Sequence, residues 1–219
     1  MTFSAIIFDM DGVLVDTEPR IFEIFRSVFT PLGIFLSDEY QYRFIGKPFS
    51  ANLHDIRRDF GIDFDQETVR QIFDEAYARG LASQPLPLQA GIPELVEKAR
   101  SFGMKLALCT TTSRAQVQVI FEQIRKSSAI DPPELFQAVI TGDDVTRRKP
   151  HPEPYLTAAA ALNCAPARCL AIEDTVTGLA SAQAAGCPTA VLRHPYNAHM
   201  DFSAADWLLD DLFQAQTLI

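Results

Sequence analysis

The sequence lacks several features that would place it in a common class. Its four cysteines form no C-x-x-C pair and no zinc-binding spacing, which favours reduced, buried thiols over a disulfide or zinc framework. Basic residues are few, because 19 Lys and Arg stand against 28 Asp and Glu, a net charge of −9. Since nucleic acids and anionic membranes attract basic surfaces, we expect neither as a partner.

Long hydrophobic runs are also missing. No uncharged stretch reaches membrane-spanning length, and Asp9 and Asp11 interrupt the first apolar run, which no basic residue precedes. The segment therefore does not read as a signal peptide, and we expect a cytoplasmic monomer. A chain of 219 residues with 47% hydrophobic and 21% charged residues suits one globular domain, or one domain with a smaller one inserted.

Short apolar runs alternate with helical patterns over most of the chain. Near-continuous apolar runs of this length are typical of parallel strands covered on both faces. Strands are predicted at Phe3–Phe8, Lys105–Cys109, Ala138–Ile140, Cys169–Ile172 and Thr189–Leu192, and helices at 92–100, 113–124, 153–162 and 175–185. The alternation predicts an α/β fold with a doubly wound parallel sheet.

Residues 17–83 break this rhythm. Apolar residues recur there at helical spacing, in one stripe from Ile21 to Phe29 and another from Val69 to Tyr77, and no strand pattern is present. A crossover between strands needs only one helix, whereas this segment has roughly 65 residues. We therefore predict an inserted all-helical subdomain at 17–83, with an α/β core at 1–16 and 84–219.

Polar side chains follow the predicted strands at the edge where α/β proteins bind ligands. Asp9 and Asp11 follow the first strand, Thr110 the second, Lys149 the third, and Glu173 with Asp174 the fourth. Four carboxylates against one lysine repel one another strongly unless a cation joins them. Oxygen ligands without nearby His or Cys favour Mg²⁺, and a cation with a lysine and hydroxyls suits a phosphoryl group.

These residues match a known family in the order of its motifs. The run DMDGVLVDTE at 9–18 resembles motif I of the haloacid dehalogenase superfamily, Thr110 its motif II, Lys149 its motif III, and the pair Glu173–Asp174 its motif IV. The runs at 149–155 and 172–178 are similar to the beta-phosphoglucomutase-like and phosphoglycolate-phosphatase-like branch. That branch carries a helical cap just after motif I, which implies that the helices at 17–83 form such a cap.

The resemblance implies a role for each motif residue in catalysis. Asp9 would be the nucleophile that takes the phosphoryl group, and Asp11 the acid that protonates the leaving alkoxide and then activates water. The Thr110 hydroxyl and the Thr111 backbone N–H would hold phosphoryl oxygens, and Lys149 would offset their charge. The implied Mg²⁺ ligands are the Asp9 and Asp174 side chains, the Asp11 carbonyl and, through water, Glu173.

The same residues also fit other structural roles. A calcium loop fails at Val13, Leu14 and Arg20, where an EF-hand needs other residue types. Residues 110–113 also suit a helix cap, a role compatible with phosphate binding, and Lys149 before Pro150 also suits an ordinary surface lysine. The four histidines have no metal-binding spacing and are expected in loops or at the surface.

Within the family, the sequence favours a phosphatase acting on a small phosphate monoester, a sugar phosphate among the candidates. Mutases of this branch carry a His soon after motif I, where this chain has Arg20 and Ile21, and an Arg three residues after the cap-loop glycine, where Gly46 is followed by Lys47, Pro48 and Phe49. A sugar phosphomutase remains the alternative, and a regulatory phospho-acceptor a remoter one. A dehalogenase would usually lack Asp11.

The loop at 44–49 is the candidate specificity element. Gly46 and Lys47 would meet the leaving group, although a solvated lysine explains Lys47 equally well. Phe44 and Phe49 belong either to the core of the helical segment or to the substrate surface.

Overall fold

The apolar runs form one parallel sheet in the computed structural model, which describes residues 3–128 and 130–219. The strand order is β3-β2-β1-β4-β5-β6, and every pairing is parallel. The strands are β1 (Ala5–Phe8), β2 (Lys105–Cys109), β3 (Ala138–Ile140), β4 (Cys169–Glu173), β5 (Thr189–Leu192) and β6 (Trp207–Leu209). The five predicted strands and the α/β fold class are confirmed, whereas β6 was not predicted.

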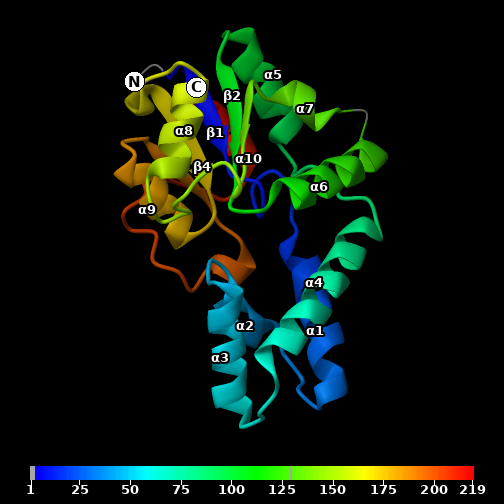
Figure 1. Cartoon of the computed structure of the whole chain (residues 1–219). Helices are drawn as coiled ribbons and strands as arrows, with labels where there is room; N and C mark the ends of the chain where they lie inside the picture. Colours follow the sequence, from blue (N-terminus) through cyan, green and yellow to red (C-terminus); the bar gives the residue numbers. More distant parts are fainter. Residues whose placement is uncertain (1–2, 129) are drawn as a thin grey trace. The chain divides into compact units, whose positions relative to one another are not determined.

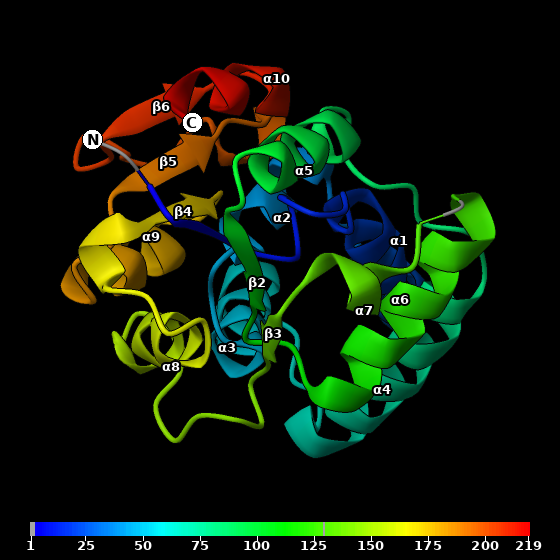
Figure 2. The ribbon, with the colours of Figure 1, turned by 90° about the horizontal axis from the view of Figure 1, so that it is seen from above.

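Helices cover both faces of this sheet (Figure 2). On one face lie α8 (Glu153–Ala161) and α9 (Val176–Ala184); on the other lie α5 (Ile92–Ser101), α6 (Arg114–Ser127), α7 (Pro132–Leu135) and α10 (Leu212–Ala215). Alternate strand residues such as Ile7 and Ala171 pack against Tyr155 and Ala158 of α8, and all four are fully buried. Burial on both faces explains why the strands read as continuous apolar runs.

Short 3₁₀ turns complete this part of the chain at η3 (Pro166–Arg168), η4 (Pro195–Asn197) and η5 (Gln216–Leu218). The four cysteines are free, and three of them are buried. Across residues 3–128 and 130–219, no helix combines the length and the apolar character needed to cross a membrane.

By its internal contacts the chain divides into two compact units, one made of Met1–Asp16 and Pro85–Ile219 and the other of Thr17–Gln84. The helices and 3₁₀ turns of the second unit are consecutive in the sequence. All residues of this unit are described, and they contain no strand. They are α1 (Glu18–Phe29), η1 (Thr30–Leu32), α2 (Asp38–Gln41), η2 (Tyr42–Phe44), α3 (Phe49–Phe60) and α4 (Gln66–Ala82). Figure 1 labels the four α-helices.

The core of the helical unit is built from aromatic side chains. Phe25 of α1 lies at its centre, with ring centroids 4.7 Å from Phe44 and 4.6 Å from Phe73. Phe49 packs on Phe73 at 4.4 Å. Phe44 and Phe49 therefore contribute to packing within this unit, the first of the two roles considered for them. Gly80 lets α4 approach α1 closely, since a Cβ there would lie 2.6 Å from the Ile24 side chain.

Candidate active site

The site is built where β1 and β4 end side by side. Phe8 of β1 is in register with Ile172 of β4, and the Asp9 backbone N–H donates to the Ile172 carbonyl at 2.9 Å. This register brings the next residues, Asp9 and Glu173, together at the carboxyl edge of the sheet. Asp9, Glu173 and Asp174 are all buried, and one carboxylate oxygen from each lies within 4.8 Å of the others.

Lys149 joins two of these carboxylates. Its Nζ lies 2.5 Å from Asp9 Oδ1 and 2.6 Å from Glu173 Oε1, and it donates to the Cys109 carbonyl at 2.9 Å. The Lys149 side chain is only 5% exposed. It is therefore not the surface lysine that its place before Pro150 also allowed. Three acceptors around one ammonium group satisfy all of its N–H donors.

Burial and charge act in opposite directions at this pair. Burial raises the pKa of Asp9 to about 8, because Lys149 only partly offsets it while Glu173 and Asp11 add to the rise. Burial alone would lower the pKa of Lys149, but Asp9 and Glu173 raise it well above its ordinary value. The lysine thus stays charged, and one ammonium group does not balance the acids around it.

The Glu173 carboxylate is held by several neighbours besides Lys149. The Tyr155 phenol of α8 donates to Glu173 Oε1 at 2.6 Å, and the Asp174 N–H donates to Oε2 at 3.2 Å. A Cβ at Gly178 would lie 2.0 Å from the Glu173 carboxyl group, so only glycine fits there. Tyr155 was missed as a site residue, although it closes the run at 149–155 on which the family resemblance rests.

Asp11, the second acid in the loop after β1, lies in a different environment from Asp9. Asp11 is partly exposed, and its carboxylate accepts from the Thr112 hydroxyl at 2.9 Å. Gly12 has a positive φ of 78°, and a Cβ there would lie 2.0 Å from Asp174 Oδ2. Because a side chain would collide with that carboxylate, glycine lets the loop after β1 approach the loop after β4.

The loop after β2 presents threonines of different exposure. Thr110 is buried, with Oγ1 accepting from the Thr112 N–H at 3.1 Å, whereas Thr111 is exposed. The N-cap of α6 is Ser113, which forms a capping box with Gln116. The capping role considered for residues 110–113 thus belongs to Ser113.

The predicted specificity residues lie in the helical unit. Gly46 and Lys47 are exposed, and Lys47 Nζ lies 3.1 Å from Asp55 Oδ2 on α3. Lys47 is therefore engaged in an ion pair within the helical unit, a role that the sequence did not predict. The hydrogen bond from Lys47 lowers the pKa of Asp55, so that the Asp55 carboxylate is charged at neutral pH.

The donor set at the edge of the sheet fits a hard cation. The three grouped ligand residues offer carboxylate oxygens only, and all three are buried beside a single lysine. Hard divalent cations prefer this chemistry, and binding one would relieve the repulsion among the acids. The cluster could thus hold a metal ion. Asp11, a predicted ligand through its carbonyl, does not belong to the carboxylate group.

Three more residues at this edge were missed by the sequence analysis: His194, Tyr196 and Asn197, in and beside η4. His194 lies with its Nε2 2.7 Å from the Gly12 carbonyl oxygen and is only partly exposed. The expectation that the histidines lie in loops is confirmed for His194, but its side chain faces the loop after β1. No local spacing signals this, because the two residues are 182 positions apart.

A doubly wound parallel sheet with buried acids and a lysine at its carboxyl edge defines an α/β enzyme. Residues 6–192 match the family model described as haloacid dehalogenase-like hydrolase, and the chain belongs to this family. This confirms the resemblance drawn from the motifs. Its known relatives include phosphatases, and the chain is a hydrolase of the phosphatase type.

Three relatives illustrate the similarity. Protein CbbY of Rhodobacter capsulatus is 35% identical over 224 residues, 99% of this chain and 97% of that protein. The phosphorylated carbohydrates phosphatase of Thermotoga maritima is 33% identical over 182 residues, 83% of this chain and 81% of that protein. A crystal structure of a CbbY variant from Rhodobacter sphaeroides in complex with xylulose-(1,5)bisphosphate has a TM-score of 0.79 and 27% identity, covering 97% of this chain and 96% of that one.

Proposed function

We propose that this enzyme is a Mg²⁺-dependent phosphatase that hydrolyses a phosphorylated sugar through an aspartyl-phosphate on Asp9. The observation that carries the proposal is the buried group of Asp9, Lys149, Glu173 and Asp174, in which one ammonium faces three carboxylates. Such a group accepts an anionic phosphate ester only with a further positive charge. The edge at the carboxyl ends of the strands is also where a parallel sheet of this kind binds a ligand.

Asp9 and Asp11 divide the chemistry between them. The Asp9 carboxylate attacks phosphorus, the bond to the sugar oxygen breaks, and Asp11 gives its proton to the leaving alkoxide. Asp11 then takes a proton from water, the water oxygen attacks the phosphorus of the aspartyl-phosphate, and Asp9 leaves as a carboxylate with inorganic phosphate as product. The Thr112 hydroxyl, 2.9 Å from Asp11 Oδ2, holds the acid in place.

The remaining site residues bind and neutralise. Asp9, Asp174, Glu173 and the Asp11 carbonyl would hold Mg²⁺, which supplies positive charge beside the phosphoryl oxygens. Thr110 and the Thr111 N–H would bind those oxygens, and Lys149 would offset their charge from the other side.

The Asp11 carbonyl, the proposed ligand, is held in one direction by the turn after β1. The Gly12 N–H donates to the Val15 carbonyl at 2.8 Å. Because N–H and C=O point in opposite directions across a trans peptide, this bond also fixes the direction of the Asp11 carbonyl.

We assign the helical unit, Thr17–Gln84, as a cap that closes over bound substrate and excludes water. Gly46 and Lys47 are the proposed specificity residues within it. Because Lys47 already pairs with Asp55, a substrate anion would have to compete with that carboxylate for it.

Two relatives support a phosphorylated sugar as the substrate class. One is a phosphatase of phosphorylated carbohydrates, and the other was crystallised with xylulose-(1,5)bisphosphate. The absence of a His near Arg20 favours hydrolysis over phosphoryl transfer to a second sugar position. Location in the cytoplasm and a monomeric state remain predictions from the sequence.

The test is a phosphate-release screen over sugar monophosphates and bisphosphates with Mg²⁺. We expect many equivalents of inorganic phosphate per chain, and none from Asp9→Asn, which keeps the volume of Asp9 and the fold. Conversion of glucose-1-phosphate to glucose-6-phosphate without phosphate release would favour the mutase instead. Capture of a single phosphoryl group per chain would favour the phospho-acceptor, and full activity of Asp9→Asn would remove Asp9 as the nucleophile.

A further inference from the structure

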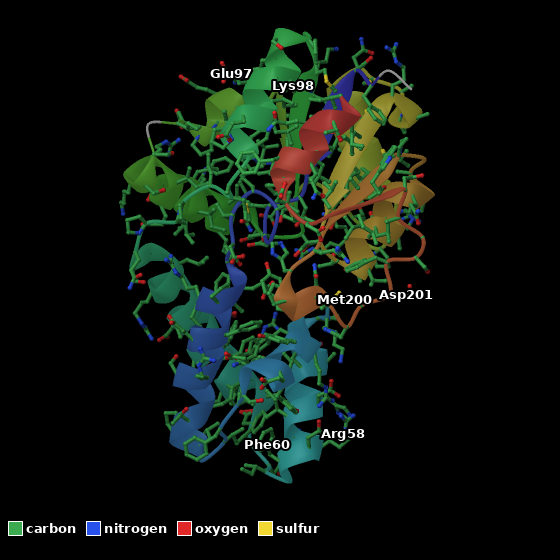
Figure 3. All side chains as sticks on the ribbon, turned by 180° about the vertical axis from the view of Figure 1, so that it is seen from behind. Arg58, Phe60, Glu97, Lys98, Met200 and Asp201 are labelled. Carbon is green, nitrogen blue, oxygen red and sulfur yellow. The ribbon has the colours of Figure 1, made fainter. Side chains whose placement is uncertain are left out.

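A short loop after β5 contacts both acidic loops of the site. It contains His194, Tyr196 and Asn197, which we call the β5 clamp, and continues through Met200 and Asp201, labelled in Figure 3, toward β6. None of the three belongs to the family motifs on which the proposed function rests.

His194 holds the loop after β1 from its backbone. Its Nε2 lies 2.7 Å from the Gly12 carbonyl oxygen, and since a carbonyl only accepts hydrogen bonds, Nε2 must carry the proton. The imidazole stacks on the Tyr196 ring, with centroids 4.6 Å apart and an interplanar angle of 12°. This stacking fixes the ring plane, so the donor stays aimed at Gly12.

Tyr196 holds the same loop at its far end. Its buried ring places the phenol 3.2 Å from Asp16 Oδ1, to which it donates. Asp16 is the last residue of the first segment of the sheet unit, and Thr17 begins the helical unit. The β5 clamp therefore forms hydrogen bonds with both ends of the segment 12–16.

Asn197 holds the loop after β4. It is fully buried, and its amide nitrogen donates to the Asp174 carbonyl at 2.9 Å and to the Leu192 carbonyl at 3.0 Å. Its Oδ1 accepts from the His194 N–H at 2.7 Å. One side chain thus connects β5, the backbone of Asp174 and the residue that grips Gly12.

The two loops that the β5 clamp connects repel each other. One carries Asp9 and the other Glu173 and Asp174, whose carboxylate oxygens lie within 4.8 Å of one another, and Asp11 adds to the repulsion at Asp9. The clamp reaches both loops through neutral donors that bond to backbone carbonyls, except for the phenol of Tyr196. It therefore sets their separation without adding a charge that would compete with Lys149 or a cation.

We propose that His194, Tyr196 and Asn197 are positioning residues that hold the loop after β1 at a fixed distance from Asp174. The β5 clamp would keep the ligand oxygens of both loops in place before a cation or substrate arrives. The inference rests on the proposed function only for its kinetic readout, because the ordering of the loop is a property of the substrate-free protein. Residues that orient metal ligands typically change metal affinity or activity by about 10–100-fold when removed.

The test compares His194→Ala and Tyr196→Phe with wild type and with His199→Ala, an exposed histidine of the same loop as control. In metal-free, substrate-free protein we expect faster amide hydrogen exchange at residues 12–16 in both clamp variants. Calorimetry without substrate should give a Mg²⁺ dissociation constant about 10–100-fold weaker for His194→Ala. The kcat for phosphate release should fall by a similar factor, with KM for the substrate little changed.

Conservative replacement separates positioning from general support of the fold. His194→Gln keeps an N–H donor that can reach the Gly12 carbonyl, so it should recover part of the Mg²⁺ affinity lost in His194→Ala. Should His194→Ala fail to fold, Tyr196→Phe, which removes one hydroxyl, carries the test. The proposal is overturned if both clamp variants match His199→Ala in exchange and Mg²⁺ affinity, or if their losses follow only a drop in global stability. A wild-type protein that releases no phosphate would overturn the proposed function, while the exchange and Mg²⁺ measurements would still decide on the β5 clamp.

Discussion

Replacement of Lys149 by Met tests the charge balance on which the site depends. Met keeps much of the length of the lysine stem but removes the ammonium group that lies 2.5 Å from Asp9 and 2.6 Å from Glu173. The Lys149 and Glu173 side chains are 5% and 0% exposed, so solvent does not take over the lost role. The variant therefore leaves two buried carboxylates without their shared cation.

The size of the effect follows from the cost of breaking a buried ion pair, about 3–5 kcal/mol. For a chain of this size, a loss of that order lowers Tm by roughly 6–20 °C. Part of it is recovered when Asp9 binds a proton. Since the folded pKa of Asp9 is raised to about 8 from 3.8, its contribution to stability is present at low pH and lost as pH rises through the folded pKa. Because wild-type Asp9 is protonated below about pH 8, the deficit of the Lys149→Met variant should grow as pH rises through about 8.

Trp207 provides the assay, because it is the one tryptophan in the sequence and lies in β6 of the sheet unit. Its fluorescence reports thermal unfolding of that unit in metal-free protein across the pH range. The exposed Lys126 of α6, changed to Met, is the matched control and should leave Tm within a degree or two of wild type. Adding Glu173→Gln to Lys149→Met should restore part of the loss by removing one buried charge. A Lys149→Met protein as stable as wild type at pH 9 would refute the reasoning.

Three further predictions concern the acids and their packing. Gly178→Ala places a methyl group 2.0 Å from the Glu173 carboxyl, so we expect a loss of about 1–3 kcal/mol in urea unfolding; an unchanged midpoint would contradict the packing seen here. Mg²⁺ affinity should rise about tenfold per pH unit from pH 5 to 8, because Asp9 must release a proton; calorimetry in buffers of different ionisation enthalpy measures that proton, and a pH-independent affinity would argue against Asp9 as a ligand. Asp11→Asn should slow the hydrolysis of sugar phosphates by about 10²–10⁴-fold and that of activated aryl phosphates far less; equal losses of rate for both would count against the acid role of Asp11.

The parts of the fold that the sequence predicted share a strong local signal. Apolar runs flanked by helical patterns located five strands, and their carboxyl ends located Asp9, Lys149 and Glu173. The sixth strand, Trp207–Leu209, was missed, although β3 is equally short, also buries one residue and was predicted. A segment of three residues has no recognisable period, so local pattern does not decide such cases, and the place of β6 in the sheet is set by pairing with β5.

The missed residues of the site act across the fold rather than along the chain. Tyr155 reaches Glu173 from α8, and Asn197 holds the Asp174 carbonyl from the loop after β5. Each forms a hydrogen bond whose partner is distant in sequence, so residue type and spacing do not identify it. The ion pair of Lys47 with Asp55 was missed for another reason: Asp55 is only eight positions away, but Lys47 lies in a loop, so no helical spacing relates the two residues.

The discontinuous origin of the site has a consequence for how the enzyme matures. Asp9 and Lys149 are 140 positions apart in the sequence. Asp9 follows β1 and Lys149 follows β3, and β2 lies between these two strands in the sheet. The two residues therefore meet only after the central strands have paired. Parallel pairings between such distant segments form slowly, because the chain must first lose the entropy of the large loops between them. A growing polypeptide therefore stays inert until synthesis has passed Asp174, the last acid of the site along the chain. Onset of turnover during synthesis or refolding should mark the closing of the central sheet.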